Sequence, residues 1–162
     1  MTGRELEELT IGLEHDGWQA ILDEIAESDH KPQIIPVNSE RAKESIVKLQ
    51  MTTQSYLGAS VFNTGGMIFG NGLVKLYGSG SDMIPDISAV NLLTTVDDYP
   101  GALLLGYDVF GGVFALDAGG LGVETGSVCF QSVDTLEWES MESPPLILPI
   151  LAHRWITDRR VL

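Results

Sequence analysis

Two pairs of carboxylates lie close together in the sequence and are the first candidates for acid–base chemistry. Asp97 and Asp98 are adjacent, and Glu137 and Glu139 are separated by Trp138. Two carboxylates in one site can act as general acid and general base when their environments separate their pKa values. Adjacent residues on a strand or helix point in different directions, so neither sequence pair by itself forms a shared proton site. Glu137 and Glu139 can share one strand face, yet solvated acids explain both pairs without catalysis.

Glycine-rich and serine motifs do not match the spacing that phosphate binding or nucleophilic catalysis requires. Gly70-Asn71-Gly72 and Gly78-Ser79-Gly80 lack the third glycine of a dinucleotide fingerprint and the Gly-Lys-Ser/Thr end of a P-loop. Turn glycines explain both motifs, and we expect no nucleotide site and no cofactor. Ser79 and Ser81 lie outside any Gly-x-Ser-x-Gly, the motif that presents a serine nucleophile on a sharp turn.

Metal binding and thiol chemistry find little support in the sequence. Zinc sites draw on closely spaced histidines and cysteines, often as a His-x-x-x-His pair on a helix. The chain has one cysteine, Cys129, within an apolar run, and three scattered histidines, His15, His30 and His153. We therefore expect no metal site and no intramolecular disulfide, and we expect Cys129 to be a small core residue.

Length and composition favour one packed domain. The chain has 162 residues, 44% of them hydrophobic, which is enough for one core and short for two. No apolar run approaches the roughly 20 residues that a membrane-spanning helix needs. The first residues also lack the basic and apolar regions of a secretion signal, so we expect a cytoplasmic protein.

The formal charge of −14 is spread unevenly along the chain. Residues 1–30 carry a net charge of −8, and residues 61–142 contain Lys75 as their one base against eleven acids. Such a charge disfavours sequence-independent binding to phosphates and attracts cationic partners. Acidic composition without any dedicated contact surface is the plainer alternative, and it stays open.

Two amphipathic helices are expected in the first third of the chain. Asp16 can cap a helix over about 17–28, whose apolar stripe at helical spacing consists of Trp18, Ile21, Leu22 and Ile25. Ser39 can cap a second helix that ends near Gln50. The segment 31–37 between them contains two prolines and is expected to be an extended connector.

From Met51 onward, glycine-rich turns separate short apolar runs. Fifteen of the 18 glycines lie between Gly58 and Gly126, and Asn71-Gly72 is the clearest tight turn. The runs predict strands at 57–63, 67–69, 73–77, 102–107, 113–116 and 128–131. Most of them follow one another without an intervening helix, which favours antiparallel pairing. The predicted fold class is α+β, an antiparallel β-sheet with the N-terminal helices packed on one face.

Three stretches of the sequence occur together in a fixed order, at residues 65–80, 111–117 and 134–139. With Asp16-Gly17-Trp18 and the run 49–53, they resemble an uncharacterised bacterial family, domain of unknown function 2625. The likeness spans about residues 10–142. No catalytic residues are known for that family, so the resemblance assigns none.

A shorter pattern resembles a second group of proteins. The run from Gly112 to Asp117, followed by 128–131, is similar to a pattern of the SUKH superfamily. Members of that superfamily are α+β domains that often act as immunity proteins against bacterial toxins. The resemblance implies a SUKH-like fold and a role in binding rather than in catalysis.

The sequence after Glu142 departs from the family pattern. Residues 143–162 carry a net charge of +2 and contain three prolines, whereas the family resemblance implies an aromatic, helix-forming stretch. Proline opposes completion of a helix there. We expect one α+β domain over residues 1–142 and an atypical C-terminal tail over 143–162, either divergent or produced by a change of reading frame.

The leading hypothesis is a non-enzymatic binding protein, similar to SUKH-type immunity proteins, whose acidic surface occupies a basic site on a toxin. Carboxylates that face a cationic cleft speed association and improve selectivity. The candidate contact residues are Asp97, Asp98, Asp108, Glu137 and Glu139. We expect neither a nucleic acid nor a membrane as the partner.

Two alternatives remain open. The interval 78–100, expected to be a loop with a short helix near 87–93, is long enough to border a pocket for a small ligand or an enzyme substrate. Convergent polar groups with perturbed pKa values would favour that alternative. The other alternative is a homodimer formed through an exposed strand edge.

Overall fold

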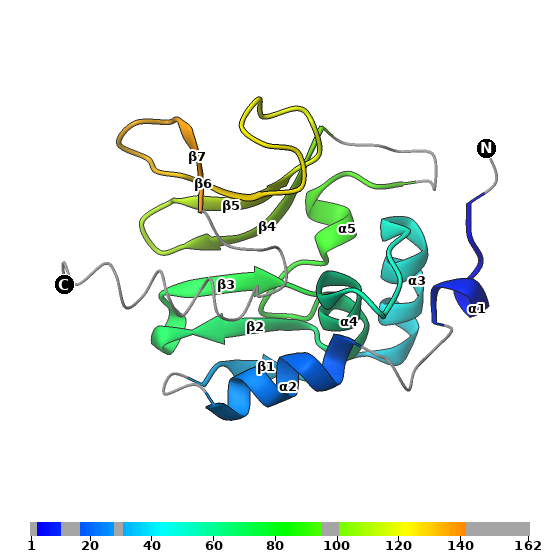
Figure 1. Ribbon diagram of the computed structural model, residues 1–162. Helices are drawn as coiled ribbons and strands as arrows, with labels where there is room; N and C mark the ends of the chain where they lie inside the picture. The colour runs from blue at the N-terminus through cyan, green and yellow to red at the C-terminus, as the bar shows by residue number, and fades with distance from the viewer. Residues whose placement is uncertain (1–2, 11–16, 28–30, 95–100, 142–162) are drawn as a thin grey trace.

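The computed structural model describes residues 3–10, 17–27, 31–94 and 101–141, which are the residues discussed below (Figure 1). The helices in these ranges are α1 Leu6–Leu9, α2 Gly17–Glu27, α3 Ser39–Leu49, α4 Tyr56–Asn63 and α5 Ile87–Val90. The strands are β1 Gln33–Ile35, β2 Gly66–Phe69, β3 Val74–Tyr77, β4 Ala102–Asp108, β5 Val113–Asp117, β6 Val128–Gln131 and β7 Trp138–Ser140. A 3₁₀ turn, η2 Gly70–Gly72, joins β2 to β3 and confirms the tight turn expected there.

Helices α2 and α3 confirm the two helices predicted from the amphipathic pattern. Ile21 of α2 is fully buried, as its place on the apolar stripe implies. The cap of α3 is Asn38 rather than Ser39, because Asn38 Oδ1 accepts the backbone N–H of Arg41 at 3.1 Å. Asp16, the predicted cap of the first helix, lies outside the described residues.

The strand predicted at 57–63 is wrong, because these residues form most of helix α4. Ser55 caps this helix, and its hydroxyl oxygen accepts the N–H of Gly58 at 3.0 Å. Five consecutive residues, 57–61, are buried, so no polar stripe marks the helix in the sequence. A short, continuously apolar run fits a buried strand and a buried helix equally well.

The seven strands form one antiparallel sheet in the order β1-β2-β3-β4-β5-β6-β7, which confirms the predicted α+β class. Each strand pairs with its neighbours in sequence, so successive connections alternate between the two ends of the sheet. The β2–β3, β4–β5 and β6–β7 connections lie together at the left in Figure 1. We call this end of the sheet the turn end.

Strand β1 lies in the segment that was expected to be only an extended connector. It pairs with β2 over three residues, from Gln33 opposite Ile68 to Ile35 opposite Gly66, and it forms one edge of the sheet. Pro32 precedes the strand and the next proline follows it, which suits an edge position. The extended conformation was therefore predicted correctly, and the pairing was not.

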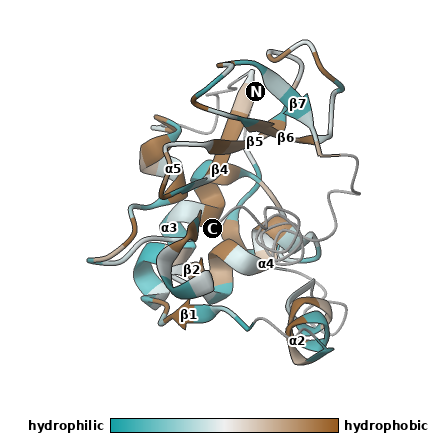
Figure 2. Ribbon diagram, turned by 90° about the vertical axis from the view of Figure 1, so that its left-hand side faces the viewer, coloured by the Kyte–Doolittle hydropathy of each residue, from teal (hydrophilic) through white to brown (hydrophobic). Residues whose placement is uncertain are grey.

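The main core lies between the sheet and helices α2 and α4. Ile21 of α2 and Val61 of α4 belong to one buried cluster with Met67, Phe69 and Phe114 of the sheet. Figure 2 looks along the strands from the turn end and shows α2 and α4 on the same side of the sheet, with α5 on the other. Helix α3 packs against α1, α4 and α5.

Candidate protein-contact surface

Three of the five predicted contact residues lie in the described part of the chain, and all three are near the turn end. Asp108 is the last residue of β4, Glu137 immediately precedes β7, and Glu139 lies within β7. Asp97 and Asp98 lie outside the described residues.

Asp108 is 3% exposed, so the structure places it inside the β4–β5 turn rather than on an exposed acidic surface. Its Oδ1 accepts the backbone N–H groups of Phe110 and Gly112, both at 2.8 Å. The backbone N–H of Asp108 also donates to the carbonyl of Gly112 at 3.0 Å. Aspartate commonly stabilises turns by accepting amides two to four residues ahead, and this role explains the burial.

The second carboxylate oxygen of Asp108 is buried and has no hydrogen-bond partner. A Cβ atom added at Gly112 would lie 2.6 Å from this Oδ2 and would overlap the ring of Phe130, so glycine is needed there. A buried acceptor without a donor retains its desolvation cost. The turn end therefore contains one buried acceptor that the described residues leave unused.

Large apolar side chains are exposed on two adjoining turns at this end. Val109 and Phe110 of the β4–β5 turn are 57% and 48% exposed, and Val133 and Leu136 of the β6–β7 loop are 48% and 68% exposed. The two turns are in contact, since a Cβ atom added at Gly111 would lie 2.9 Å from Val133 Cγ1. We define the turn-end surface as these four apolar residues with the exposed carboxylates Asp134, Glu137 and Glu139.

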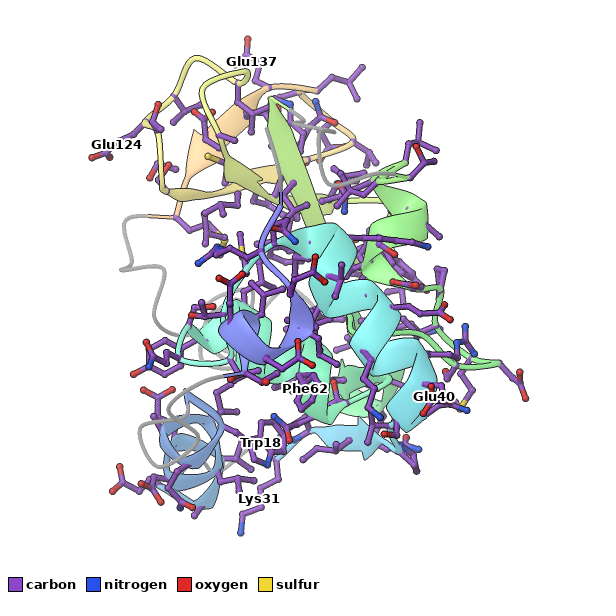
Figure 3. All side chains as sticks on the ribbon, turned by 90° about the vertical axis from the view of Figure 1, so that its right-hand side faces the viewer. Trp18, Lys31, Glu40, Phe62, Glu124 and Glu137 are labelled. Carbon is purple, nitrogen blue, oxygen red and sulfur yellow. The ribbon has the colours of Figure 1, made fainter. Side chains whose placement is uncertain are left out.

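The β6–β7 loop is held in a fixed shape by its own hydrogen bonds. The N–H of Leu136 donates to the carbonyl of Ser132 at 2.9 Å, and Gln131 Nε2 donates to the carbonyl of Leu136 at 3.0 Å. Leu136 adopts φ of 56°, a left-handed conformation that is unfavourable for leucine. Figure 3 shows the side chain of Glu137 pointing away from the body of the protein. Within the described ranges, none of the three carboxylates of the turn-end surface forms an ion pair.

At the other end of the sheet, Asp117 ends β5 and organises the loop that leads to β6. It is 1% exposed. Its Oδ1 accepts the N–H groups of Gly119 and Leu121 at 2.8 and 3.2 Å, and its Oδ2 accepts those of Val123 and Glu124, both at 3.1 Å. Burial by itself raises the pKa of Asp117, but the four amide donors outweigh it and hold the pKa below its usual value.

In the described part of the 78–100 interval, Ser79 and Asp86 are engaged in hydrogen bonds of the fold. Helix α5 confirms the short helix expected there. The Ser79 hydroxyl donates to the carbonyl of Thr64 at 2.9 Å. Asp86 Oδ1 accepts from the hydroxyls of Ser45 and Ser88 at 2.8 and 2.9 Å and from the N–H of Ser88 at 2.8 Å. These contacts connect the interval to α3 and to the C-terminal end of α4.

The described ranges show no sign of a metal centre or of a membrane-spanning helix, and their one cysteine is buried. Those ranges contain no group of three or more histidine, cysteine or acidic residues arranged to hold a metal ion. None of the helices they contain has the length and apolar character needed to cross a bilayer. Cys129 is fully buried and is a core residue, as predicted.

Sequence reasoning found the exposed acids but missed the apolar half of the turn-end surface and the role of Asp117. A signal was available for the role of Asp117 and for the burial of Asp108. Asp108 is followed by Gly111-Gly112 and Asp117 by Gly119-Gly120. An aspartate just before a glycine-bearing turn indicates a side chain that accepts the turn's amides.

Comparison with known proteins identifies relatives of unknown function. The sequence profile described as "Protein of unknown function DUF2625" matches residues 6–144. The chain is 35% identical over 141 residues to "Putative uncharacterized protein YbfG" of Escherichia coli K12, an alignment of 86% of this chain and 64% of the relative. It is 31% identical over 140 residues to an "Uncharacterized protein" of Haemophilus influenzae, covering 84% of this chain and 61% of the relative. The chain thus spans somewhat less than two thirds of the length of these relatives. Because the matched residues make up most of the sequence, the chain belongs to the DUF2625 family.

Proposed function

We propose that this chain is a non-enzymatic binding protein that engages a cationic protein partner through the turn-end surface. One observation carries the proposal: two adjoining turns expose four large apolar side chains next to three carboxylates that form no ion pair within the described residues. Scattered exposed apolar residues are normal, whereas a contiguous apolar patch with a polar rim is typical of protein contact sites.

The two kinds of residue have separate tasks in this proposal. Apolar side chains such as Phe110 and Leu136 supply area that is removed from water on binding. Glu137 and Glu139 attract the partner over longer distances and raise the association rate, aided by the formal charge of −14. The same charge makes two copies of the chain repel each other, which disfavours the homodimer alternative.

The specific form of the proposal is an immunity protein that neutralises a toxin in the cytoplasm. The resemblance of residues 112–117 to the SUKH pattern supports it. Toxins that act on nucleic acid need cationic clefts to bind phosphates, and a surface bearing carboxylates is complementary to such a cleft.

Site-specific photo-cross-linking tests the proposal. Benzoylphenylalanine replaces Leu136, which is 68% exposed, and the full chain is expressed in its native host. Leu92, two residues after the end of α5, is a matched control because it is 78% exposed and has φ of 57° against 56° for Leu136. We expect position 136 to trap a partner of basic isoelectric point and position 92 not to trap it. Trapping of the same proteins from both positions, or of an acidic partner, would contradict the proposal.

A further inference from the structure

A row of side chains crosses the sheet on the face opposite helices α2 and α4. Direct pairing sets Lys75 opposite Tyr107, Tyr107 opposite Val113, Val113 opposite Gln131, and Gln131 opposite Trp138. Directly paired residues of an antiparallel sheet share one face. The core residues Met67 and Phe69 alternate with this row, so they lie on the other face. All five members of the row are half-buried. We call them the aromatic row.

The aromatic row adjoins the turn-end surface. Tyr107 stands two residues before the exposed Val109, and Trp138 directly follows Glu137. Gln131, a member of the row, also donates its side-chain amide to the carbonyl of Leu136. A partner bound to the turn-end surface can therefore also contact the aromatic row, because no described strand lies between them.

One ring of this face is already in contact with a cation of this chain. Lys75 Nζ lies 5.9 Å from the centre of the Tyr107 ring, within the range of a cation–π interaction. The Tyr77 ring lies 5.6 Å from that of Tyr107 at an interplanar angle of 39°. Tryptophan is the strongest of the aromatic side chains in this role. Trp138 directly follows the exposed Glu137, whereas Glu139 pairs with Phe130 and lies on the other face of the sheet.

We infer that the partner's contact continues from the turn-end surface onto the aromatic row, where Trp138 anchors a lysine or arginine side chain of a cationic protein and Tyr107, whose ring already contacts Lys75, supplies ring area for the contact. This inference rests on the proposed function and adds the anchoring residues and the chemistry that they recognise. Tyrosine and tryptophan are frequent energetic centres of protein interfaces, and charge complementarity selects a basic segment over a second copy of this acidic chain.

Panning a phage library of random 12-residue peptides on the immobilised full chain, at near-physiological salt, tests the inference. Enriched peptides should combine lysine or arginine with aromatic or aliphatic residues. Tyr107→Ala and Trp138→Ala should each raise the dissociation constant of these peptides by about tenfold or more. Tyr107→Phe and Trp138→Phe keep a ring and should stay within about threefold of the original chain. Phe62→Ala, which removes a half-buried ring from α4, is the matched control and should leave binding unchanged.

A measurement on the original chain removes the dependence on variant stability. The indole N–H signal of Trp138 in a heteronuclear NMR spectrum, assigned with Trp138→Phe, should shift on addition of an enriched peptide. If enriched peptides are basic but alanine variants bind normally and this signal stays fixed, the inference is overturned and the proposed function stands. If enriched peptides show no excess of basic residues, both are overturned.

Discussion

Strands β4 and β5 both end in a buried aspartate followed by a glycine-bearing connection, but the two aspartates are satisfied to different degrees. Asp117 uses both carboxylate oxygens to accept four backbone amides. Asp108 accepts two amides through Oδ1, and its Oδ2 has no partner. The fully satisfied carboxylate closes the loop at one end of the sheet. The partly satisfied one lies at the end where Val109 and Phe110 are exposed.

This difference distinguishes a structural end of the molecule from the end that we propose as the contact surface. The Asp117 carboxylate can accept all four backbone N–H groups only when the loop after β5 adopts one conformation. That loop therefore has one strongly preferred shape. A turn held by two amides has fewer constraints of this kind, and it carries apolar side chains whose burial requires a partner. Substitutions at the two aspartates therefore test the division between the two ends.

The largest expected effect is that of Asp117→Asn. The new amide group would replace Oδ2 and point an N–H at the N–H groups of Val123 and Glu124, leaving both donors unpaired. We expect the melting temperature to fall by about 6–12 °C. Thermal unfolding followed by circular dichroism checks this, and a fall of less than about 2 °C would show that the loop does not depend on this carboxylate.

Gly112→Ala should have the next largest effect on stability. The added methyl group would overlap the Phe130 ring and crowd Asp108 Oδ2, so the β4–β5 turn must shift. Overpacking of this kind costs about 1–3 kcal/mol in the free energy of unfolding. Gly122→Ala is a useful contrast, because a Cβ atom there meets nothing within 4 Å and the penalty comes from its φ of 70° alone. Denaturant unfolding of both variants checks whether Gly112→Ala loses more unfolding free energy than Gly122→Ala.

The pH dependence of stability should show the contribution of Asp117. Its pKa is lowered in the folded state, so the unfolded chain binds more protons in acid and protonation favours unfolding. The stability from Asp117 is fully present above the unfolded pKa of about 4 and is lost as the pH falls through the folded value. The free energy of unfolding, measured from pH 7 downward, should fall less steeply below pH of about 4 for Asp117→Asn than for the original chain. Identical acid profiles would contradict this assignment.

Asp108→Asn should have the smallest effect on stability. The substitution keeps an acceptor for Phe110 and Gly112 and replaces an oxygen that has no donor. Weaker hydrogen bonds to a neutral acceptor and relief of the buried unpaired charge oppose each other, so we expect a change within about 1 kcal/mol. A loss as large as that of Asp117→Asn would remove the distinction between the two ends.

The sequence allowed most of the sheet to be predicted because turn glycines and β-branched runs are local signals. Strands β2 to β6 and helices α2 and α3 follow from such signals. Helix α4 was mistaken for a strand because burial of residues 57–61 removed its polar stripe. The pairing of β1 depends on β2, which lies some thirty residues further along the chain, and a local pattern does not contain that information.

The candidate site was only half predictable for a similar reason. Glu137 and Glu139 were found because charge is visible in the sequence, and both lie at the turn end. Asp108 is equally acidic, but the turn that follows it draws its carboxylate inward. Whether Phe110 and Leu136 are exposed depends on turn conformation, such as the left-handed backbone of Leu136, which the surrounding tertiary structure decides.

The most direct test of a cationic partner at the turn-end surface is its association rate, measured against ionic strength with the partner trapped through position 136. We expect a steep decrease with salt for the original chain. For the variant carrying Glu137→Lys and Glu139→Lys, we expect association about tenfold slower at low salt and a weaker salt dependence. The control variant carries Glu44→Lys on α3 and Asp82→Lys on the loop after β3, so it has the same net charge. Its association rate should decrease much less. Equal rates for the two double variants, or a rate independent of salt in the original chain, would contradict the account.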